Sequence, residues 1–300
     1  MIICEKVEEL ETKTLADHLR VAATELEAAG IPDSRREASG LLEFAGGLSR
    51  TEVIAYPDRI LGTDQTRRFL ECLERRKKRE PFHYITGEKE FFGLSFHVDD
   101  RVLIPRPETE LLVEIGLKRL HEIDRPVFCE VGIGSGCVSI SILKSIEDAE
   151  AIGVDISISA LEVAAINSRR HGVENRLKLV SSDLLTAVEG NGSFDAILSN
   201  PPYIAATEME DLQPEVRDFE PRHALTDESS GLTLIGRIVA ESERLLVDSG
   251  LLAIEIGHDQ REAVETMFGD DHWTSRGFLK DLQGHERIVF ATRRPRKASN

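Results

Sequence analysis

From residue 126 onward the sequence alternates between short apolar runs and segments with helical periodicity, and this alternation restricts the fold most strongly. Strands separated by helices form a parallel sheet through right-handed crossovers, and ligands bind at the carboxyl ends of such strands. The sequence therefore predicts an α/β domain whose functional residues directly follow its strands. Apolar runs of strand length lie at 127–131, 151–155, 177–180, 194–199, 251–256 and 286–292.

The first eighty residues carry a different pattern, in which apolar residues recur at helical spacing. We expect helices after Thr14, across 38–45, after Ser49 and across 64–79. The basic run 75–79 ends the last of these helices. Its simplest interpretation is a solvated helix end that complements the helix dipole, and the alternative is a docking patch for an acidic or phosphate-bearing partner.

A segment rich in aromatic residues separates the two patterns. Residues 88–98 predict a β-hairpin with a tight turn at Gly93. A helix is expected to begin near Pro107, because proline is tolerated at the first helical position. The predicted divisions are a helical domain at 1–85, a β-hairpin linker at 86–105 and an α/β domain at 106–300.

The charge and the cysteine content of the chain exclude several classes of protein. The chain has 54 acidic and 37 basic residues, for a net charge of −17, and such a surface repels phosphate backbones. The cysteines form no C-x-x-C pair, which indicates a reduced cytosolic chain without a metal site. We also find no signal peptide and no apolar run near the roughly 18 residues of a membrane span. We therefore expect a cytoplasmic protein that binds neither nucleic acid directly nor a membrane. The cysteines are Cys4, Cys72, Cys129 and Cys137.

A glycine-rich loop follows the run 127–131 and precedes a predicted helix. Its glycines are Gly132, Gly134 and Gly136, with Glu130 two places before the first. A dinucleotide-binding loop would carry its third glycine where Cys137 stands, so that match fails. The spacing instead resembles motif I of the class I S-adenosylmethionine methyltransferases, and the remaining alternative is a plain glycine turn. The resemblance implies contacts to the methionine part and the ribose of the cofactor from Gly132, Ile133, Gly134, Ser135 and Gly136.

Two acidic residues stand at the ends of the next two runs. Asp155 ends the second run, where its carboxylate could accept both ribose hydroxyls, and the alternative is that it caps the following helix. Asp183 follows the third run. It could accept a hydrogen bond from the adenine amino group while Leu184 packs on the ring, and the alternative is a solvated loop acid. Asp155, Asp183 and Leu184 are therefore predicted cofactor-binding residues.

The segment Asn200-Pro201-Pro202-Tyr203 directly follows the run 194–199. Consecutive prolines stop helix and strand alike, so a rigid turn is the plain alternative. The string resembles the N/D-P-P-Y motif of methyltransferases that act on planar nitrogens, which are poor nucleophiles because the lone pair is delocalised. The Asn200 side-chain oxygen and the Pro201 carbonyl could each accept one N–H, and Tyr203 could pack on the flat substrate group. All four residues are predicted to be catalytic and substrate-binding, Asn200 also contacts the cofactor, and catalysis rests on orientation.

The same loop occurs in enzymes that methylate a nucleobase and in enzymes that methylate a glutamine amide, so other residues must identify the substrate. The string Ile-Pro-Arg-Pro-Glu-Thr-Glu at 104–110 does so. With it, the chain closely resembles the bacterial protein-(glutamine-N5) methyltransferases of peptide-chain release factors, the HemK/PrmC family. The resemblance covers roughly residues 14–292. Further matching segments lie at 81–96, 219–221, 255–260 and 281–287.

The resemblance implies a Rossmann-like class I methyltransferase fold, with a seven-stranded, mostly parallel sheet and a small helical N-terminal domain. It implies S-adenosyl-L-methionine as cofactor, S-adenosyl-L-homocysteine as product, and the glutamine of the Gly-Gly-Gln motif in class 1 release factors as methyl acceptor. We expect a monomer. The alternatives are the same chemistry on another protein glutamine, as in ribosomal protein L3, or on an exocyclic amino group of a nucleobase. A third is a scaffold that binds the cofactor without catalysis.

A few positions depart from the family or carry a second interpretation. Glu130 stands where many members have Asp, and Leu184 where others have an aromatic residue. Arg106 is expected near the active site, where it would brace the N-P-P-Y loop or the incoming Gly-Gly-Gln loop and bind substrate. The alternative is that Arg106 and Glu108, which flank the helix start, simply pair across the domain junction. The acidic balance favours a protein partner with a basic surface.

Overall fold

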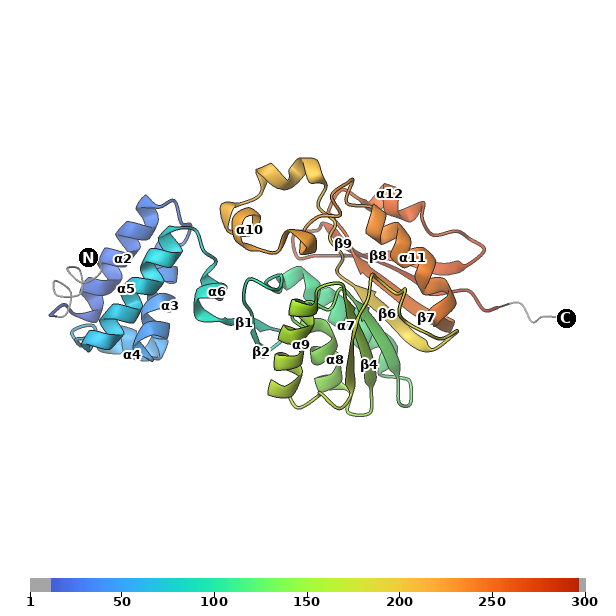
Figure 1. Ribbon diagram of the computed structural model, residues 1–300, viewed down its shortest axis with the longest axis horizontal. Coiled ribbons are helices and arrows are strands. Elements are labelled where there is room, and N and C mark those ends of the chain that lie inside the picture. The colour runs from blue at the N-terminus through green and yellow to red at the C-terminus, as the bar shows by residue number, and fades with distance from the viewer. Residues whose placement is uncertain (1–11, 297–300) are drawn as a thin grey trace. The chain divides into compact units, whose positions relative to one another are not determined.

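The computed structural model describes residues 12–296 and divides into two compact units (Figure 1). The smaller unit runs to Gly87 and also includes Gln213–Phe219. The larger unit begins at Glu88 and contains everything else. Cys4 lies outside the described residues, while Cys72, Cys129 and Cys137 are buried free thiols. Within residues 12–296 no helix combines the length and the apolar character that crossing a membrane requires.

The smaller unit is helical, as the periodicity predicted. Thr14 caps its first helix and Ser49 its third, each through a capping box in which side chain and backbone are bonded reciprocally. Gly47 ends the second helix in the left-handed conformation. The apolar stripes of the longer helices form one shared core. The helices are α2 (Leu15–Ala28), α3 (Ser34–Gly46), α4 (Arg50–Ala55), α5 (Thr63–Lys77), α6 (Phe82–Thr86) and α10 (Pro214–Phe219).

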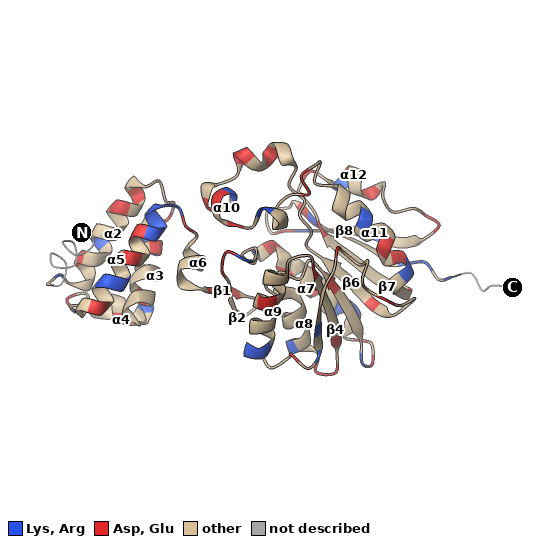
Figure 2. Ribbon diagram, in the orientation of Figure 1, with Lys and Arg blue, Asp and Glu red and all other residues tan. Residues whose placement is uncertain are grey.

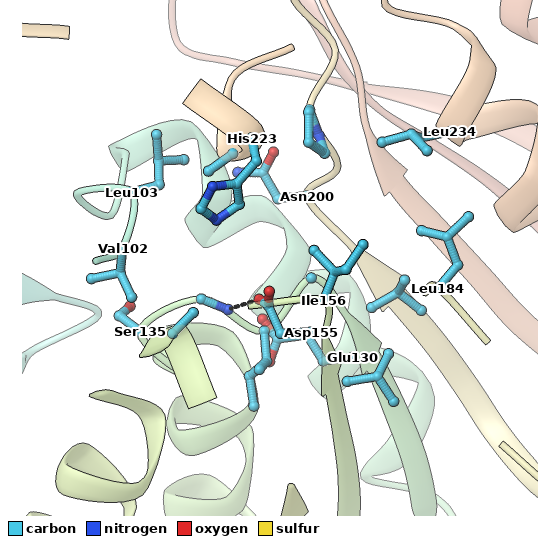
Figure 3. Close-up of a pocket in the computed structure, with 18 of the residues that line it drawn as sticks. Val102, Leu103, Glu130, Ser135, Asp155, Ile156, Leu184, Asn200, His223 and Leu234 are labelled. Atoms are coloured by element: carbon cyan, nitrogen blue, oxygen red, sulfur yellow. Dashed lines mark hydrogen bonds between the residues drawn. The ribbon is translucent and has the colours of Figure 1, made fainter. Parts of the chain in front are cut away.

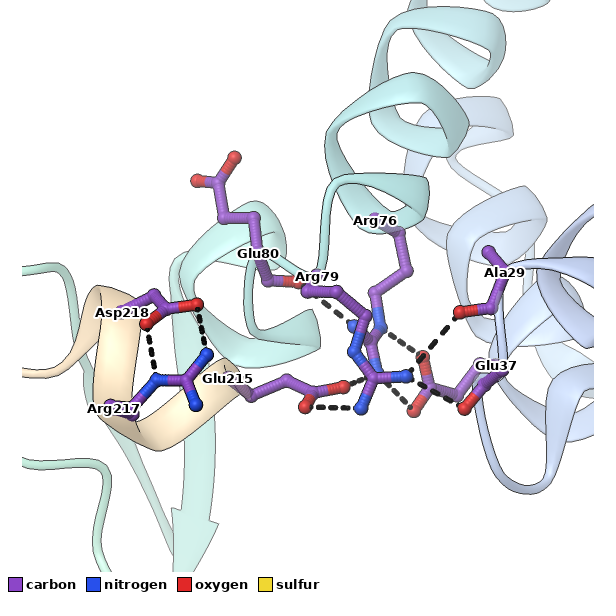
Figure 4. A network of polar contacts seen from close by, with 9 residues as sticks. Ala29, Glu37, Arg76, Arg79, Glu80, Glu215, Arg217 and Asp218 are labelled. Atoms are coloured by element: carbon purple, nitrogen blue, oxygen red, sulfur yellow. Dashed lines mark hydrogen bonds and ion pairs between the residues drawn. The ribbon is translucent and has the colours of Figure 1, made fainter. Parts of the chain in front are cut away.

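The basic end of α5 is only in part the solvated helix end that the sequence suggested, since the Arg75 side chain is 46% exposed while Arg76 is buried. Arg76 is only 3% exposed and lies between the carboxylates of Glu37 and Glu215 (Figure 4). Arg79 pairs with the other oxygen of Glu215 at 2.6 Å. Glu215 lies on α10, which belongs to the same unit as α5. Its carboxylate therefore neutralises the charge of the Arg76 guanidinium that folding has buried. Acidic residues elsewhere are spread over helices, strands and connections (Figure 2).

The larger unit is built on a seven-stranded sheet in the order β5-β4-β3-β6-β7-β9-β8. β3 to β7 pair in parallel, and β9 and β8 complete one edge in antiparallel fashion. The expected mostly parallel sheet is confirmed. The strands are β3 (Val127–Val131), β4 (Glu150–Asp155), β5 (Leu177–Ser181), β6 (Phe194–Ser199), β7 (Leu246–Glu255), β8 (Trp273–Lys280) and β9 (Glu286–Arg293).

Helices cover both faces of this sheet (Figure 1). Side chains alternate along β3, so that Phe128 joins the core under α7 and α8, while Cys129 and Val131 join the core under α11 and α12. The α-helices are α7 (Glu110–Leu120), α8 (Cys137–Ser145), α9 (Ile158–Arg170), α11 (Thr233–Leu245) and α12 (Arg261–Glu265). The 3₁₀ turns are η1 (Pro107–Thr109), η2 (Ala206–Asp211) and η3 (Arg222–Ala224).

The hairpin of β1 (Glu88–Phe91) and β2 (Leu94–His97) differs from the expected linker. Phe91 and Phe96 are 1% and 0% exposed, and both belong to the core that α7 and α8 cover. Burying two aromatic side chains stabilises the hairpin on the sheet domain by several kcal/mol, about 1.5–3 for each ring. The hairpin is therefore part of the larger unit, and that unit begins at Glu88.

Candidate active site

A cavity of about 590 Å³ opens at the carboxyl ends of β3 to β6, within the size range of small-molecule sites (Figure 3). Its walls come from the larger unit alone. The loops that follow β3, β4, β5 and β6 form one side. The segments 101–109 and 222–228 complete the wall. The topology thus brings together most of the residues predicted from sequence.

The glycine-rich loop turns tightly at the carboxyl end of β3. Gly132, Gly134 and Gly136 have φ values of 72°, 53° and 82°, in the left-handed region where a side chain is strained. A Cβ atom on Gly132 would lie 3.8 Å from the backbone oxygen of Asn200, so the loop passes close to the N-P-P-Y segment. Gly132, Ile133, Gly134 and Ser135 line the cavity, whereas Gly136 caps α8.

Asp155 holds this loop from the end of β4. Its Oδ2 accepts a hydrogen bond from Gly134 N at 3.0 Å, and its Oδ1 accepts one from Ser157 N at 2.9 Å. The helix cap is Ser157, whose hydroxyl accepts from Ala160 N, so the alternative role of Asp155 as the cap is wrong. The carboxylate lines the cavity, where its remaining lone pairs can accept from ligand hydroxyls.

Glu130 lies at the base of the cavity. It is 4% exposed, and its carboxylate accepts a hydrogen bond from Ser139 N at 2.8 Å. Burial raises the pKa of Glu130 to about 8, and the nearby charge of Asp155 acts in the same direction. The acid that precedes the glycines therefore anchors the first turn of α8 and contributes little negative charge at neutral pH.

Asp183 and Leu184 line the cavity after β5. Both Asp183 oxygens accept hydrogen bonds from Arg237, at 3.0 and 3.1 Å, so this acid is an ion-paired residue and not merely a solvated one. Leu184 takes a left-handed φ of 50°. Ile156 and Leu234 also line the cavity, and Ile156 is 65% exposed. These two apolar residues were not predicted as site residues, although Ile156 directly follows the predicted Asp155.

The N-P-P-Y segment enters the cavity through Asn200 and Pro202. Asn200 Nδ2 donates to Thr109 Oγ1 at 3.1 Å, and the Thr109 hydroxyl donates to Glu255 Oε2 at 2.7 Å. Tyr203 does not line the described cavity. Its hydroxyl donates to Glu255 Oε1 at 3.3 Å and so anchors the ring, while packing of Tyr203 on the substrate stays a prediction. The carbonyl of Tyr203 accepts from Gln260 Nε2 at 2.8 Å.

The Glu255 carboxyl group is fully enclosed at the end of β7. Burial raises its pKa to about 7, against the hydrogen bonds from Thr109 and Tyr203 that favour the ionised form. Burial and the neighbouring Glu255 charge also raise the pKa of the Tyr203 hydroxyl, which keeps Tyr203 protonated as a donor. Neither Thr109 nor Glu255 was predicted as a site residue, although both lie in the matching segments 104–110 and 255–260.

Arg106 lines the cavity and has a different partner from the one proposed as its alternative. Its Nη2 donates to Glu220 Oε1 at 2.5 Å, so the simple pairing with Glu108 is wrong. Glu220 is 5% exposed and also accepts from Ile104 N at 3.2 Å. One buried carboxylate therefore fixes both the backbone and the guanidinium of the segment 104–110.

Comparisons with known proteins give the family. Residues 17–87 match the family described as the PrmC N-terminal domain, and residues 108–215 match the methyltransferase small domain. A release factor glutamine methyltransferase of Nitratidesulfovibrio vulgaris is 40% identical over 282 residues, 93% of this chain and 95% of that protein. One of Caulobacter vibrioides is 38% identical over 284 residues, 95% and 98% of the two chains. This chain belongs to the release factor glutamine methyltransferase family.

A solved structure shares the fold of this member of the release factor glutamine methyltransferase family. A methyltransferase from Pyrococcus furiosus superposes with a TM-score of 0.51 at 16% identity, covering 69% of this chain and 92% of that one. The family and the fold imply S-adenosyl-L-methionine as the cofactor. The cavity fits it, because a glycine-rich loop, a carboxylate that can accept ribose hydroxyls and an apolar wall line one space.

Proposed function

We propose that this enzyme transfers a methyl group from S-adenosyl-L-methionine to the side-chain amide nitrogen of a glutamine in class 1 release factors, within their Gly-Gly-Gln motif. The observation that carries the proposal is the orientation of Asn200. Its Nδ2 is engaged by Thr109, which leaves Oδ1 as the acceptor offered to the substrate. An amide acceptor at the mouth of a cofactor cavity suits a substrate that presents an NH₂ group.

The cofactor would lie along the ends of β3 to β5. Residues 132–135 would surround its methionine part and ribose, and Asp155 would accept the ribose hydroxyls. Ile156, Leu184 and Leu234 would pack around adenine. When bound, it supplies an electrophilic methyl group on a sulfonium. Asp183 already pairs with Arg237, so a contact from Asp183 to the adenine amino group would share that carboxylate.

The chain's own residues would then make the amide nitrogen reactive. Asn200 Oδ1 and the Pro201 carbonyl would each accept one N–H, which holds the nitrogen with its lone pair toward the methyl group. Both oxygens would also stabilise the positive charge that develops on nitrogen as the bond forms. The nitrogen becomes acidic only at that stage, so its proton leaves to solvent afterwards and no strong base is required.

We assign recognition of the release factor to the helical unit and to Arg106. Arg106 lies on the cavity wall with one side of its guanidinium bound to Glu220, and its remaining donors can contact the incoming loop. The proposal also includes a monomeric, cytoplasmic enzyme that needs neither nucleic acid nor membrane. The net charge of −17 supports this choice of partner over a polyanion.

Mass spectrometry tests the proposal directly. A purified class 1 release factor incubated with enzyme and cofactor should gain about 14 Da on the peptide that carries Gly-Gly-Gln. A release factor with that glutamine changed to glutamate serves as the matched control and should gain nothing. Methyl transfer to ribosomal protein L3 or to DNA, with none to the release factor, would refute the substrate assignment and favour the two alternatives.

A further inference from the structure

A buried line of hydrogen bonds joins three segments that are far apart in the sequence. It runs from Asn200, which follows β6, through Thr109 at the end of η1, to Glu255, the last residue of β7. Thr109 is 3% exposed and Glu255 is 1% exposed. Buried polar groups are stable only when each donor is paired with an acceptor. The donor and the acceptor in each of these hydrogen bonds are therefore strongly constrained.

The direction of each bond follows from counting hydrogens. In its ionised form the Glu255 carboxylate only accepts, so the single hydroxyl hydrogen of Thr109 is then committed to Glu255 Oε2, 2.7 Å away. Thr109 Oγ1 can then only accept from Asn200, and Nδ2 is the part of that amide that donates. Without an acceptor at Glu255, the hydroxyl could point at Asn200 instead, and the amide could turn its NH₂ toward the substrate.

The same carboxylate also holds the other end of the N-P-P-Y segment. Its second oxygen accepts the Tyr203 hydroxyl at 3.3 Å. Glu255 therefore touches the first residue of the motif through Thr109 and the last residue directly. The two prolines between them have no backbone N–H with which to fix the loop, so these side-chain contacts hold it, together with the bond from Gln260 to the Tyr203 carbonyl.

Glu255 lies behind this loop and not in the reaction space. Thr109 and Asn200 line the described cavity, whereas Glu255 does not. It can therefore act on the reacting amide only through other residues. This separates a positioning role from a role as proton acceptor, which would need contact with the substrate or with a connecting water.

We propose that Glu255 is a positioning residue for methyl transfer, which through Thr109 fixes the Asn200 amide with its oxygen toward the substrate. The inference rests on the proposed function, because it assigns Asn200 Oδ1 to the substrate amide. It adds two residues, Thr109 and Glu255, to the machinery and gives each a separate task. Thr109 transmits the orientation, and Glu255 determines its direction.

Thr109→Val removes the hydroxyl while keeping the branched shape. We expect kcat to fall about ten- to a hundredfold, while KM for the release factor and the Kd of S-adenosylhomocysteine stay within about threefold. Thr109→Ser keeps the hydroxyl and should recover kcat to within about threefold. Thr292→Val is the matched control. Its hydroxyl donates to Thr274 O at 3.2 Å, and Thr292 pairs with Leu251, toward the opposite end of β7 from Glu255.

Two substitutions at Glu255 separate orientation from charge. In Glu255→Gln the new amide can still accept from Thr109 and can donate to the Tyr203 oxygen, so at least about a third of kcat should remain. Glu255→Leu offers no acceptor and should be as slow as Thr109→Val. Equal loss in both Glu255 variants would overturn the orientation argument, as would a kcat within about twofold of wild type for Thr109→Val. A wild-type enzyme that methylates no release factor would instead refute the proposed function itself.

Discussion

Asn200→Ala is the substitution that bears most directly on the proposed chemistry. It deletes one of the two oxygens offered to the substrate N–H groups, and it leaves Thr109 Oγ1 without its donor. The main chain of the N-P-P-Y segment is unchanged, and so is the anchor from Tyr203 to Glu255. The substitution therefore isolates the Asn200 amide from the loop that carries it.

The expected loss follows from the part that Asn200 would play in the transition state. An oriented acceptor for developing positive charge is the counterpart of an oxyanion-hole donor, whose removal lowers turnover by roughly 10²–10³. That range corresponds to about 3–4 kcal/mol. Asn200→Asp keeps an oxygen but loses the donor to Thr109, and it places a second acid one hydroxyl away from Glu255. We expect its turnover to lie between that of wild type and that of Asn200→Ala.

Single-turnover methyl transfer, followed by mass spectrometry on the Gly-Gly-Gln peptide, measures this loss without interference from product release. Calorimetric titration with S-adenosylhomocysteine on each variant reports whether the cofactor site is intact, and we expect little change in its Kd. Turnover of Asn200→Ala within about threefold of wild type, with the cofactor site intact, would refute the assignment of Asn200 to the substrate amide.

Three further outcomes follow from the structure. Asp155→Ala should weaken S-adenosylhomocysteine binding about 10- to 100-fold by calorimetry, because a charged acceptor for the ribose and for Gly134 N is lost; unchanged affinity would contradict that role. Glu215→Gln should lower the free energy of unfolding of the helical unit by about 1–3 kcal/mol in denaturant titrations, because it weakens the pairing of buried Arg76; a neutral result would show that Glu37 suffices. Glu130 binds a proton more tightly in the folded state, with a pKa of about 8 against 4.5, so its contribution to stability is full below about pH 4.5 and is lost as pH rises through 8. Glu130→Gln should therefore be more stable than wild type at pH 8 and lose that advantage toward pH 5, and a constant difference would contradict the raised pKa.

The parallel strands could be predicted because each is a short apolar run buried on both faces of the sheet. β8 was not among the predicted strands, and the burial of its residues and its place at the sheet edge explain why. Along Trp273–Lys280 the burial pattern has no run of buried residues, and the strand pairs with β9 at the sheet edge. Its formation depends on backbone pairing with a neighbour, which a local sequence pattern does not reveal.

The place of the hairpin in the larger unit and the pairing of Arg76 were not predicted, for a related reason. Phe91 and Phe96 look the same in a linker hairpin as in one buried on a sheet domain, because the surface that covers them comes from elsewhere in the chain. Arg76 belongs to a basic run whose counter-charge, Glu215, stands more than a hundred positions away. A local sequence pattern shows that a segment carries apolar or charged side chains. It does not show which distant segment packs against them or neutralises their charge.

The residues alone predict the α/β fold, the family, and the loops that could hold a cofactor and a planar amide. Those features are local, since each consists of a strand end and the few residues that follow it. How Asn200 and Arg106 are held depends on the folded chain. Thr109 lies 91 positions from Asn200, Glu255 lies 146 positions from Thr109, and Glu220 lies 114 positions from Arg106. Hydrogen-bond direction depends on which partner stands opposite, and partners across that distance meet only when the sheet has formed.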